Sequence, residues 1–139
     1  MRHLMYATME DLDELVTIDQ QVIGSTSRRD FIQKAIAEGR CIIQKTQRAI
    51  VGFLIFSTDF FDCSFINLVI VKPTERRKGI ATSLLAYYVE RASTQKVFSS
   101  TNQSNTTMQK VFATAGFIRS GYVENLDEDD PEIIYFKLR

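Results

Sequence analysis

Four basic side chains lie close together in the middle of the sequence, directly before a segment with helical periodicity. They are Lys72, Arg76, Arg77 and Lys78. The first amides of a helix have no partner within the helix and lie at the positive end of its dipole, so this combination predicts an anion site. Gly79 and Ala81 are small enough for a phosphate to approach the backbone closely. The residues predicted to surround the anion are Arg76, Arg77, Lys78, Gly79, Ile80, Ala81 and Thr82.

This loop differs from the two best-known phosphate-binding loops. It lacks the Gly-Lys-Ser or Gly-Lys-Thr ending of a Walker loop, and it lacks the GxGxxG pattern of dinucleotide-binding folds. Taken alone, RRKGIA is equally consistent with an ordinary helix start that carries basic residues. A second segment changes the interpretation. Residues Asn105 to Phe117 read NTTMQKVFATAGF, which is an asparagine, an amphipathic helix and then Gly-Phe at the opening of a strand.

Together the two segments resemble the GCN5-related N-acetyltransferase (GNAT) family. The strand that ends in VKP, the R-x-x-G-x-A loop from Arg76 and the later Asn-helix-Gly-Phe unit occur in the family's order. Asn105 and Gly116 are eleven residues apart, as in the family pattern. The resemblance is close from Phe65 to Phe117 and looser before and after this segment.

The resemblance implies an N-acetyltransferase that uses acetyl-CoA or another acyl-CoA. The pyrophosphate would lie on the loop amides, and pantetheine would pair with the strand at Val69, Ile70 and Val71 like an added strand. The amides of that strand would also polarise the thioester carbonyl. Asn105 would hydrogen-bond the cofactor arm, and Phe112 takes a further cofactor-side position seven residues later. No metal is implied, and the acyl group would pass directly to an amine in a ternary complex.

Two residues depart from the family pattern. At the position of Phe112 many members carry a tyrosine that protonates the leaving thiolate, and a phenyl ring cannot donate that proton. At the position of Asn67 many members carry a glutamate, and an amide cannot act as a base. The candidate replacements are Glu124 as the base and Tyr122 as the proton donor. A solvated turn acid and an aromatic side chain at the rim of the core are the alternative interpretations of these two residues.

Two other functions stay open. The missing tyrosine favours a module of the same fold that binds acyl-CoA without turning it over, and the basic loop alone would suit a nucleotide-binding protein outside the family. For the enzyme, six acids in the nine positions from Glu124 to Glu132 predict a cationic small-molecule amine as the acceptor, because an acidic approach concentrates cations. A solvated turn is the alternative interpretation of this acidic run.

The composition limits what the chain can be. It has 139 residues, of which 45% are hydrophobic, so one domain with one sizeable core is expected over residues 1–139. Seventeen basic and seventeen acidic residues give zero formal charge, which argues against partners such as nucleic acid or a membrane surface. The longest apolar run, Ala49 to Phe56, is too short to span a bilayer, and no secretory signal opens the chain. Cys41 and Cys63 lack the spacing of a disulfide framework or a zinc site. We therefore expect a cytoplasmic protein, monomeric or homodimeric.

The order of the predicted elements indicates an α/β (α+β) fold, a central twisted sheet, mixed but mostly antiparallel, with helices on its faces. The seven predicted strands are His3 to Ala7, Arg40 to Lys45, Ile50 to Ser57, Phe65 to Val71, Lys96 to Thr101, Phe117 to Val123 and Ile133 to Leu138. The four predicted helices are Met9 to Val22, a helix from the N-cap Ser27 to Glu38, Gly79 to Ser93, and Thr106 to Ala115. The basic loop follows the fourth strand and opens the third helix.

Overall fold

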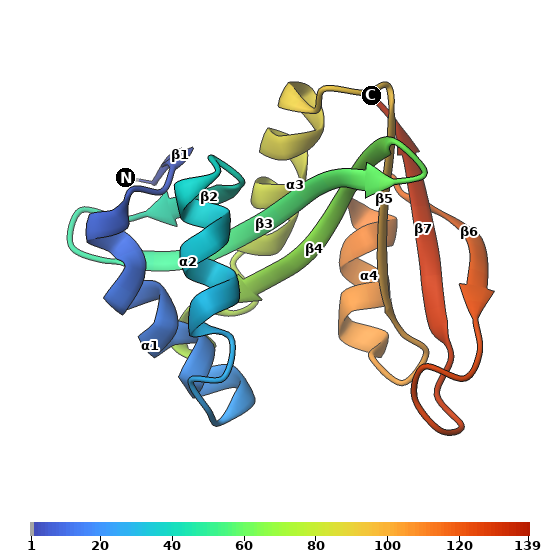
Figure 1. Cartoon of the computed structure of the whole chain (residues 1–139), viewed down its shortest axis with the longest axis horizontal. Helices are drawn as coiled ribbons and strands as arrows, with labels where there is room; N and C mark the ends of the chain where they lie inside the picture. Colours follow the sequence, from blue (N-terminus) through green and yellow to red (C-terminus); the bar gives the residue numbers. More distant parts are fainter. Residues whose placement is uncertain (1) are drawn as a thin grey trace.

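The computed structural model describes residues 2–139, which form one seven-stranded sheet with four α-helices (Figure 1). The strands are β1 (His3–Tyr6), β2 (Cys41–Lys45), β3 (Ile50–Phe60), β4 (Cys63–Val71), β5 (Lys96–Asn102), β6 (Ile118–Val123) and β7 (Glu132–Leu138). Their order across the sheet is β1-β2-β3-β4-β5-β7-β6, and β4 with β5 is the parallel pair among antiparallel neighbours. The predicted fold class, including the number of strands and helices, is confirmed.

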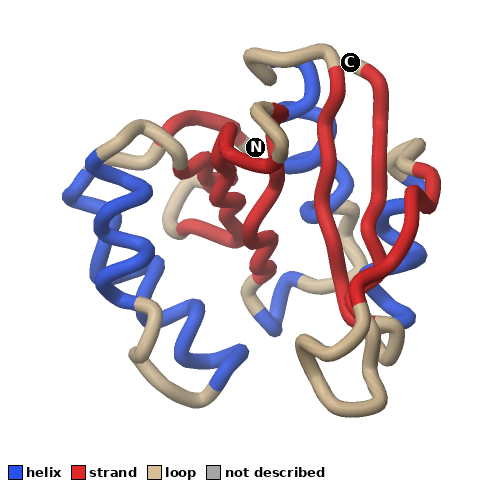
Figure 2. Tube along the Cα trace, turned by 45° about the vertical axis from the view of Figure 1, so that its right-hand side comes forward, coloured by secondary structure: helices blue, strands red, loops and turns tan. Residues whose placement is uncertain are grey.

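The helices cover the two faces of the sheet in pairs. They are α1 (Leu12–Ile23), α2 (Arg29–Ala37), α3 (Ile80–Arg91) and α4 (Thr106–Thr114), with 3-10 turns at Met9–Asp11 and Pro73–Glu75. The apolar side chains of α1 and α2 form one core with β2, β3 and the end of β4. Those of α3 and α4 form a second core on the other face, which extends to β5 and β7. Figure 2 shows α1 and α2 side by side at one edge of the molecule, apart from α3 and α4.

The start of α2 differs from the prediction. Ser27 is not the N-cap, because α2 begins at Arg29 and Arg28 stands at the cap position without a side-chain cap. The Arg28 guanidinium instead donates from Nε to Oδ2 of the buried Asp19 in α1, at 3.0 Å. Ser27 Oγ lies 3.0 Å from Ser25 Oγ. The residue at the start of α2 therefore makes an ion pair with α1 and does not cap its own helix.

The two central strands are longer than the sequence pattern predicts. β3 continues to Phe60 and β4 begins at Cys63, so the predicted connection between Ser57 and Phe65 shrinks to a two-residue turn. Phe61 and Asp62 both have left-handed backbones, with φ of 51° and 63°. A turn with two such residues matches the twist of an antiparallel hairpin, which lets the strands pair up to the turn.

A bulge in β4 precedes the place where the sheet opens. Ile66 pairs with Phe56 and Leu68 pairs with Ile55, so Asn67 is the extra residue. After it, β4 continues beside β3, whereas its pairing with β5 covers only Ser64 to Ile66. Figure 1 shows β4 and β5 diverging from this point.

The bulge also changes which side chains of β4 face which core. Ile66, Val69 and Val71 belong with α3 and α4, whereas Leu68 and Ile70 belong with α1 and α2. Successive side chains of a regular strand alternate between the two faces, so residues 66 and 69 can share a face only because one extra residue lies between them.

Gly52 in β3 sets how closely α3 approaches the sheet. A Cβ atom at this position would lie 2.9 Å from Cγ2 of Ile80 and 3.0 Å from the carbonyl oxygen of Ile70. Neither distance leaves room for a methyl group, so the first residue of α3 can rest on β3 because residue 52 is glycine. This contact holds the start of α3 beside the open end of β4.

Candidate functional site

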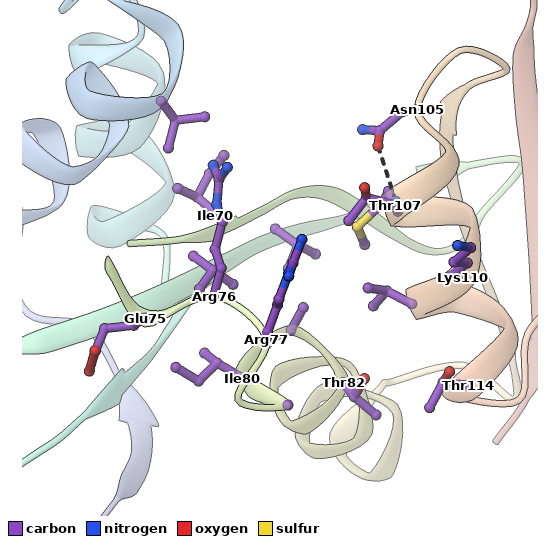
Figure 3. Close-up of a pocket in the computed structure, with 17 residues that line it drawn as sticks. Ile70, Glu75, Arg76, Arg77, Ile80, Thr82, Asn105, Thr107, Lys110 and Thr114 are labelled. Atoms are coloured by element: carbon purple, nitrogen blue, oxygen red, sulfur yellow. Dashed lines mark hydrogen bonds between the residues drawn. The ribbon is translucent and has the colours of Figure 1, made fainter. Parts of the chain in front are cut away.

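A cleft of about 950 Å³ lies where β4 and β5 separate (Figure 3). Its walls are the end of β4, the loop before α3, the first turn of α3 and the α4 side facing them, with Val22 of α1. Ile70 and Val22 belong to the α1 and α2 core, whereas Val69 and Val71 belong to the α3 and α4 core. The cleft therefore passes through the sheet and reaches both of its faces.

Most of the predicted cofactor-binding residues line this cleft. They are Val69, Ile70, Val71, Arg76, Arg77, Gly79, Ile80, Ala81, Thr82 and Asn105. Two of the predicted residues, Lys78 and Phe112, do not line it, and neither do Tyr122 and Glu124. The structure thus brings together two segments that are about 25 residues apart in sequence.

Lys78 does not line the cleft, and its side chain and carbonyl both have partners. Its Nζ donates to Oε2 of Glu75 at 2.9 Å, and its carbonyl oxygen accepts from Nη1 of Arg2 at 2.9 Å. The hydrogen bond from Lys78, with the charges of Lys78, Lys72 and Arg2, holds the pKa of Glu75 below its ordinary value. The predicted contribution of Lys78 to the anion site is therefore not supported by its position.

The backbone of the loop presents unpaired donors to the cleft. Arg77 and Gly79 have left-handed backbones, with φ of 65° and 77°. The Ser83 N–H donates to the Gly79 carbonyl at 3.0 Å, so the three preceding amides of α3 have no partner within the helix. Figure 3 shows the guanidinium groups of Arg76 and Arg77 extending from the loop into the space between β4 and α4, with Glu75 turned away. The arrangement is an anion site with two flanking cations.

The end of β4 also offers free backbone donors. The Lys72 N–H donates to the Val51 carbonyl at 2.8 Å, so residue 72 faces β3. Backbone groups in an antiparallel pair alternate in direction, and the amides of Val71 and Val69 therefore face away from β3, into the gap. β5 has diverged at this level. An extended ligand in the gap could pair with these groups as a further strand would.

The opposite wall comes from α4, which begins at Asn105. The Asn105 Oδ1 accepts from the Met108 N–H at 3.0 Å and caps the helix, which leaves its side-chain NH₂ group as a donor. Figure 3 shows Asn105 on the wall opposite Arg76 and Arg77. The sequence-based prediction missed the other α4 residues on this wall, which are Thr107, Met108, Lys110, Val111 and Thr114. Their helical spacing was the available signal, although two of them, Met108 and Val111, also pack against the core.

Phe112 lies in the core and not at the cleft. Its side chain is 1% exposed and stacks on Tyr135 with ring centroids 4.6 Å apart, and Phe117 lies on it at 5.3 Å. The residue predicted to lie on the cofactor side is therefore covered by core side chains and does not line the cleft in this structure. The physical reason is that α4 turns its 112 position toward the sheet, where two aromatic rings cover it.

Tyr122 and Glu124 lie at the end of the edge strand β6 and are exposed, Tyr122 by 64%. The acidic run that follows is partly used for structure. Asp127 Oδ2 accepts from Asn102 Nδ2 at 2.8 Å, and the two carboxylate oxygens of Asp130 accept from Ser104 N and Oγ at 2.9 Å and 2.6 Å. Two acids of the run therefore hold the connection between β5 and α4, directly before Asn105.

The Cys41 thiol is buried in the core under α1 and α2. Burial raises the pKa of the Cys41 thiol to about 12, so it is not a thiolate at neutral pH. Across residues 2–139, no group of three or more His, Cys, Asp or Glu side chains is arranged to hold a metal ion. In the same part of the chain, each helix is too short or too polar for a membrane span.

Comparisons with known proteins agree with this geometry. The model of the Acetyltransferase (GNAT) family matches residues 8–117. The chain is similar to a GNAT-family acetyltransferase from Bacillus cereus, with 55% identity, a TM-score of 0.97 and coverage of 100% of this chain and 98% of that one. Among curated proteins, no sequence matches the chain.

More distant structures share the fold. The ribosomal-protein-S18-alanine N-acetyltransferase from Escherichia coli has 16% identity and a TM-score of 0.84, with 99% of this chain and 94% of that chain covered. The protein yncA from Salmonella typhimurium, determined with its cofactor acetyl-CoA, has 13% identity and a TM-score of 0.80, with the same coverage of 99% and 94%. Both are similar to this chain in fold.

Proposed function

The chain belongs to the GNAT acetyltransferase family and is an N-acetyltransferase, and from this premise we propose that it transfers the acetyl group of acetyl-CoA to a cationic small-molecule amine. The observation that carries the proposal is the cleft through the sheet, with an anion site at one end and free strand amides beside it. Bound acetyl-CoA supplies an activated acetyl thioester. The reaction needs the two substrates together and no covalent enzyme intermediate.

The anion site fits the pyrophosphate of CoA. The first amides of α3, Ile80 to Thr82, would donate to phosphate oxygens, and Arg76 and Arg77 would neutralise their charge. Gly79 has nothing within 4 Å of the position of a Cβ, so a ligand can approach the backbone there. These features support the binding of a diphosphate group. They do not distinguish one nucleotide from another.

The groups around the gap fit the remainder of acetyl-CoA. An amide-rich arm could pair with the backbone at Val69 and Val71, and the side-chain NH₂ of Asn105 could donate to it from the other wall. An amide that faces the gap could donate to the thioester oxygen and stabilise the negative charge that develops there. This role needs no titratable side chain.

The acceptor would approach from the side of the acidic run. Glu124, Glu128 and Asp129 are exposed there, and an acidic approach attracts cationic amines. We propose Glu124 as a direct contact for the charge of the amine, and Tyr122, exposed on the same strand end, as a group that can supply a proton. Both assignments rest on their location at the end of β6.

A second candidate function is a module that binds acyl-CoA without turning it over. The burial of Phe112 favours it, because the family's usual proton donor is replaced by a residue that is covered by Tyr135 and Phe117. A thiol has a pKa of about 8.5, however, so CoA can leave as a thiolate near neutral pH without this donor.

Two measurements separate these functions. Thermal unfolding with acetyl-CoA at one hundred times its Kd should show about 2.7 kcal/mol of added stability. The release of CoA should then be followed with polyamines, amino acids, aminoglycosides and peptide N-termini as acceptors. Binding with turnover supports the enzyme, and binding without turnover of any acceptor supports the module. Equal affinity for acetyl-CoA, ATP and NAD would contradict both.

A further inference from the structure

The face of the sheet opposite α4 leaves a row of half-buried side chains uncovered next to the gap. On β5 and β7 fully buried residues alternate with half-buried ones, and the buried ones, such as Val97 and Ile133, belong to the α3 and α4 core. The half-buried ones therefore lie on the opposite face. The core formed by α1 and α2 includes no residue of β5 or β7 among residues 2–139. The cleft opens to this same face at Ile70.

Ser100 and Glu132 lie on this face and contact each other. Ser99 is the last residue of β5 that pairs with β4, so Ser100 is the first residue beyond the point of divergence. Its hydroxyl donates to Oε2 of Glu132 on β7 at 2.7 Å, which directs the carboxylate toward β5 and the gap. Glu132 is half-buried, and none of the ion pairs in residues 2–139 includes it. It is a carboxylate held by a hydroxyl, with no cation to neutralise it.

The strand neighbours of Glu132 carry no charge. Its direct neighbour on β5 is Asn102, and its neighbour on β6 is Val123, both uncharged. The charged groups nearest to these two neighbours are acids: Asp127, which is bonded to Asn102, and Glu124, which comes after Val123. The basic residues of the same strands, Lys96, Arg119 and Lys137, lie further along them.

We propose that Glu132 is the catalytic base that takes the proton of the acceptor amine, and that Ser100 positions its carboxylate. The inference rests on the proposed acetyltransferase function. The acceptor nitrogen forms a bond to the acetyl carbonyl carbon, the carbon–sulfur bond breaks, and CoA leaves as a thiolate. The proton lost by the nitrogen moves to a carboxylate oxygen of Glu132 and from there to solvent. No oxidant or metal enters this balance.

Glu132 differs from the other acids of the run in its surroundings. Asp127 and Asp130 are occupied by hydrogen bonds to the β5–α4 connection. Glu124, Glu128 and Asp129 are exposed on the loop, away from the sheet. Glu132 is the acid of the run that lies within a strand, where its carboxylate is bonded to Ser100 of β5, the strand that borders the gap.

The test compares Glu132→Gln, Glu132→Asp and Glu132→Ala with the wild type, with spermidine as the first acceptor and the rest of the screened panel after it. We expect Glu132→Gln to lower kcat about 10²- to 10⁴-fold with the KM for acetyl-CoA unchanged. Glu132→Asp should keep part of the activity, and added formate should restore part of the activity of Glu132→Ala. Glu90→Gln, on the exposed end of α3, is the matched control and should behave as the wild type.

A binding measurement gives a readout other than activity. Calorimetric titration of spermidine into the complex with CoA should show weaker binding for Glu132→Gln than for the wild type, while CoA itself binds both equally. Wild-type kcat in Glu132→Gln would overturn the inference. A loss that formate does not repair, combined with a lower Tm, would assign Glu132 a structural role and also overturn it. Binding of acetyl-CoA by the wild type without turnover of any acceptor would instead refute the enzyme function, and this inference with it.

Discussion

Two adjacent basic residues, Arg77 and Lys78, have different surroundings and should contribute differently to binding. Arg77 lines the cleft, whereas Lys78 does not and its ammonium is bonded to Glu75. The two residues look equivalent in the sequence, yet we expect Arg77 to contact the ligand and Lys78 to support the loop. The same distinction applies to the acids, since Asp130 holds a loop and Glu132 faces an open part of the sheet.

Removing the two side chains separately tests this difference. Arg77→Ala should weaken acetyl-CoA binding about tenfold, because a charge-assisted hydrogen bond contributes about 1.5 kcal/mol or more. Lys78→Ala should change the Kd little, although it removes the same charge from the same loop. Calorimetric titration of both variants measures this. Equal losses would mean that only the net charge of the loop matters.

A hydroxyl at position 112 should be harmful to the fold and should not help the reaction. Phe112→Tyr places a polar atom between Tyr135 and Phe117 in the core, and a buried hydroxyl without a partner costs about 1–3 kcal/mol. We expect a lower Tm and no gain in kcat, measured by thermal unfolding and by CoA release. A higher kcat with an unchanged Tm would show that the ring reaches the cleft when acetyl-CoA binds.

At the scale of the elements, the site depends on how a strand ends and a helix begins. The bulge at Asn67 turns the amides of Val69 and Val71 toward the gap, and Gly52 lets α3 rest on β3. Together they bring free strand amides and free helix amides to the same cleft. The acidic run also has a structural role, because Asp127 and Asp130 form hydrogen bonds with Asn102 and Ser104 before α4.

Gly79 and Gly39 offer a matched pair for testing the helix start. Both have left-handed backbones, with φ of 77° and 72°, and open space around the position of a Cβ. Glutamate at either position should therefore cost a similar amount of stability, about 1–2 kcal/mol for the backbone. Only Gly79→Glu should abolish the stabilisation by acetyl-CoA in thermal unfolding, because its carboxylate would lie at the anion site. Retained stabilisation would place the pyrophosphate elsewhere.

The exposed acids of the β6–β7 connection can be neutralised without disturbing its anchors. Changing Glu128 to Gln and Asp129 to Asn leaves Asp127 and Asp130 bonded. We expect a higher KM for a cationic acceptor at low salt and an unchanged KM for acetyl-CoA, and the difference should fade as salt screens the charges. Steady-state kinetics at two ionic strengths measure this. Identical acceptor kinetics at low salt would leave the exposed acids without a role in recognition.

At the scale of the whole molecule, the cleft lies between two parts of one sheet that share little pairing. On one side are β1 to β4 with α1, α2 and α3, and on the other are β5 to β7 with α4. The two parts are joined by the short pairing of Ser64 to Ile66 with Val97 to Ser99 and by the core under α3 and α4. A ligand that contacts both walls should therefore tie them together.

Hydrogen exchange should reveal this coupling. Saturating acetyl-CoA should slow the exchange of the Val69 and Val71 amides and of the first turn of α4, because these groups form opposite walls of the cleft. The amides of β2 and β3, already paired on both sides, should change by no more than the global stabilisation allows. Slowing confined to the α3 loop would mean that the ligand contacts one wall only.

The sequence alone determined the features that depend on neighbouring residues. Helical periodicity, small residues and basic side chains within a few positions predicted the anion loop. Strand-like apolar runs predicted the seven strands, and apolar residues three and four positions apart predicted the four helices. These features follow from local geometry, in which spacing decides which side chains share a face. The order of two such segments was enough to identify the family resemblance.

Only the tertiary structure decided which of these side chains reach the site. Phe112 and Val111 are neighbours in the sequence, yet Phe112 is covered by Tyr135 and Val111 lines the cleft. Ser27 was the predicted N-cap of α2, but Arg28 stands at that position and is bonded to Asp19 of α1. Ser100 and Glu132 are 32 residues apart and meet because β7 pairs with β5 in one register. Register, bulges and helix rotation depend on packing between distant segments, and no local pattern in the chain contains that information.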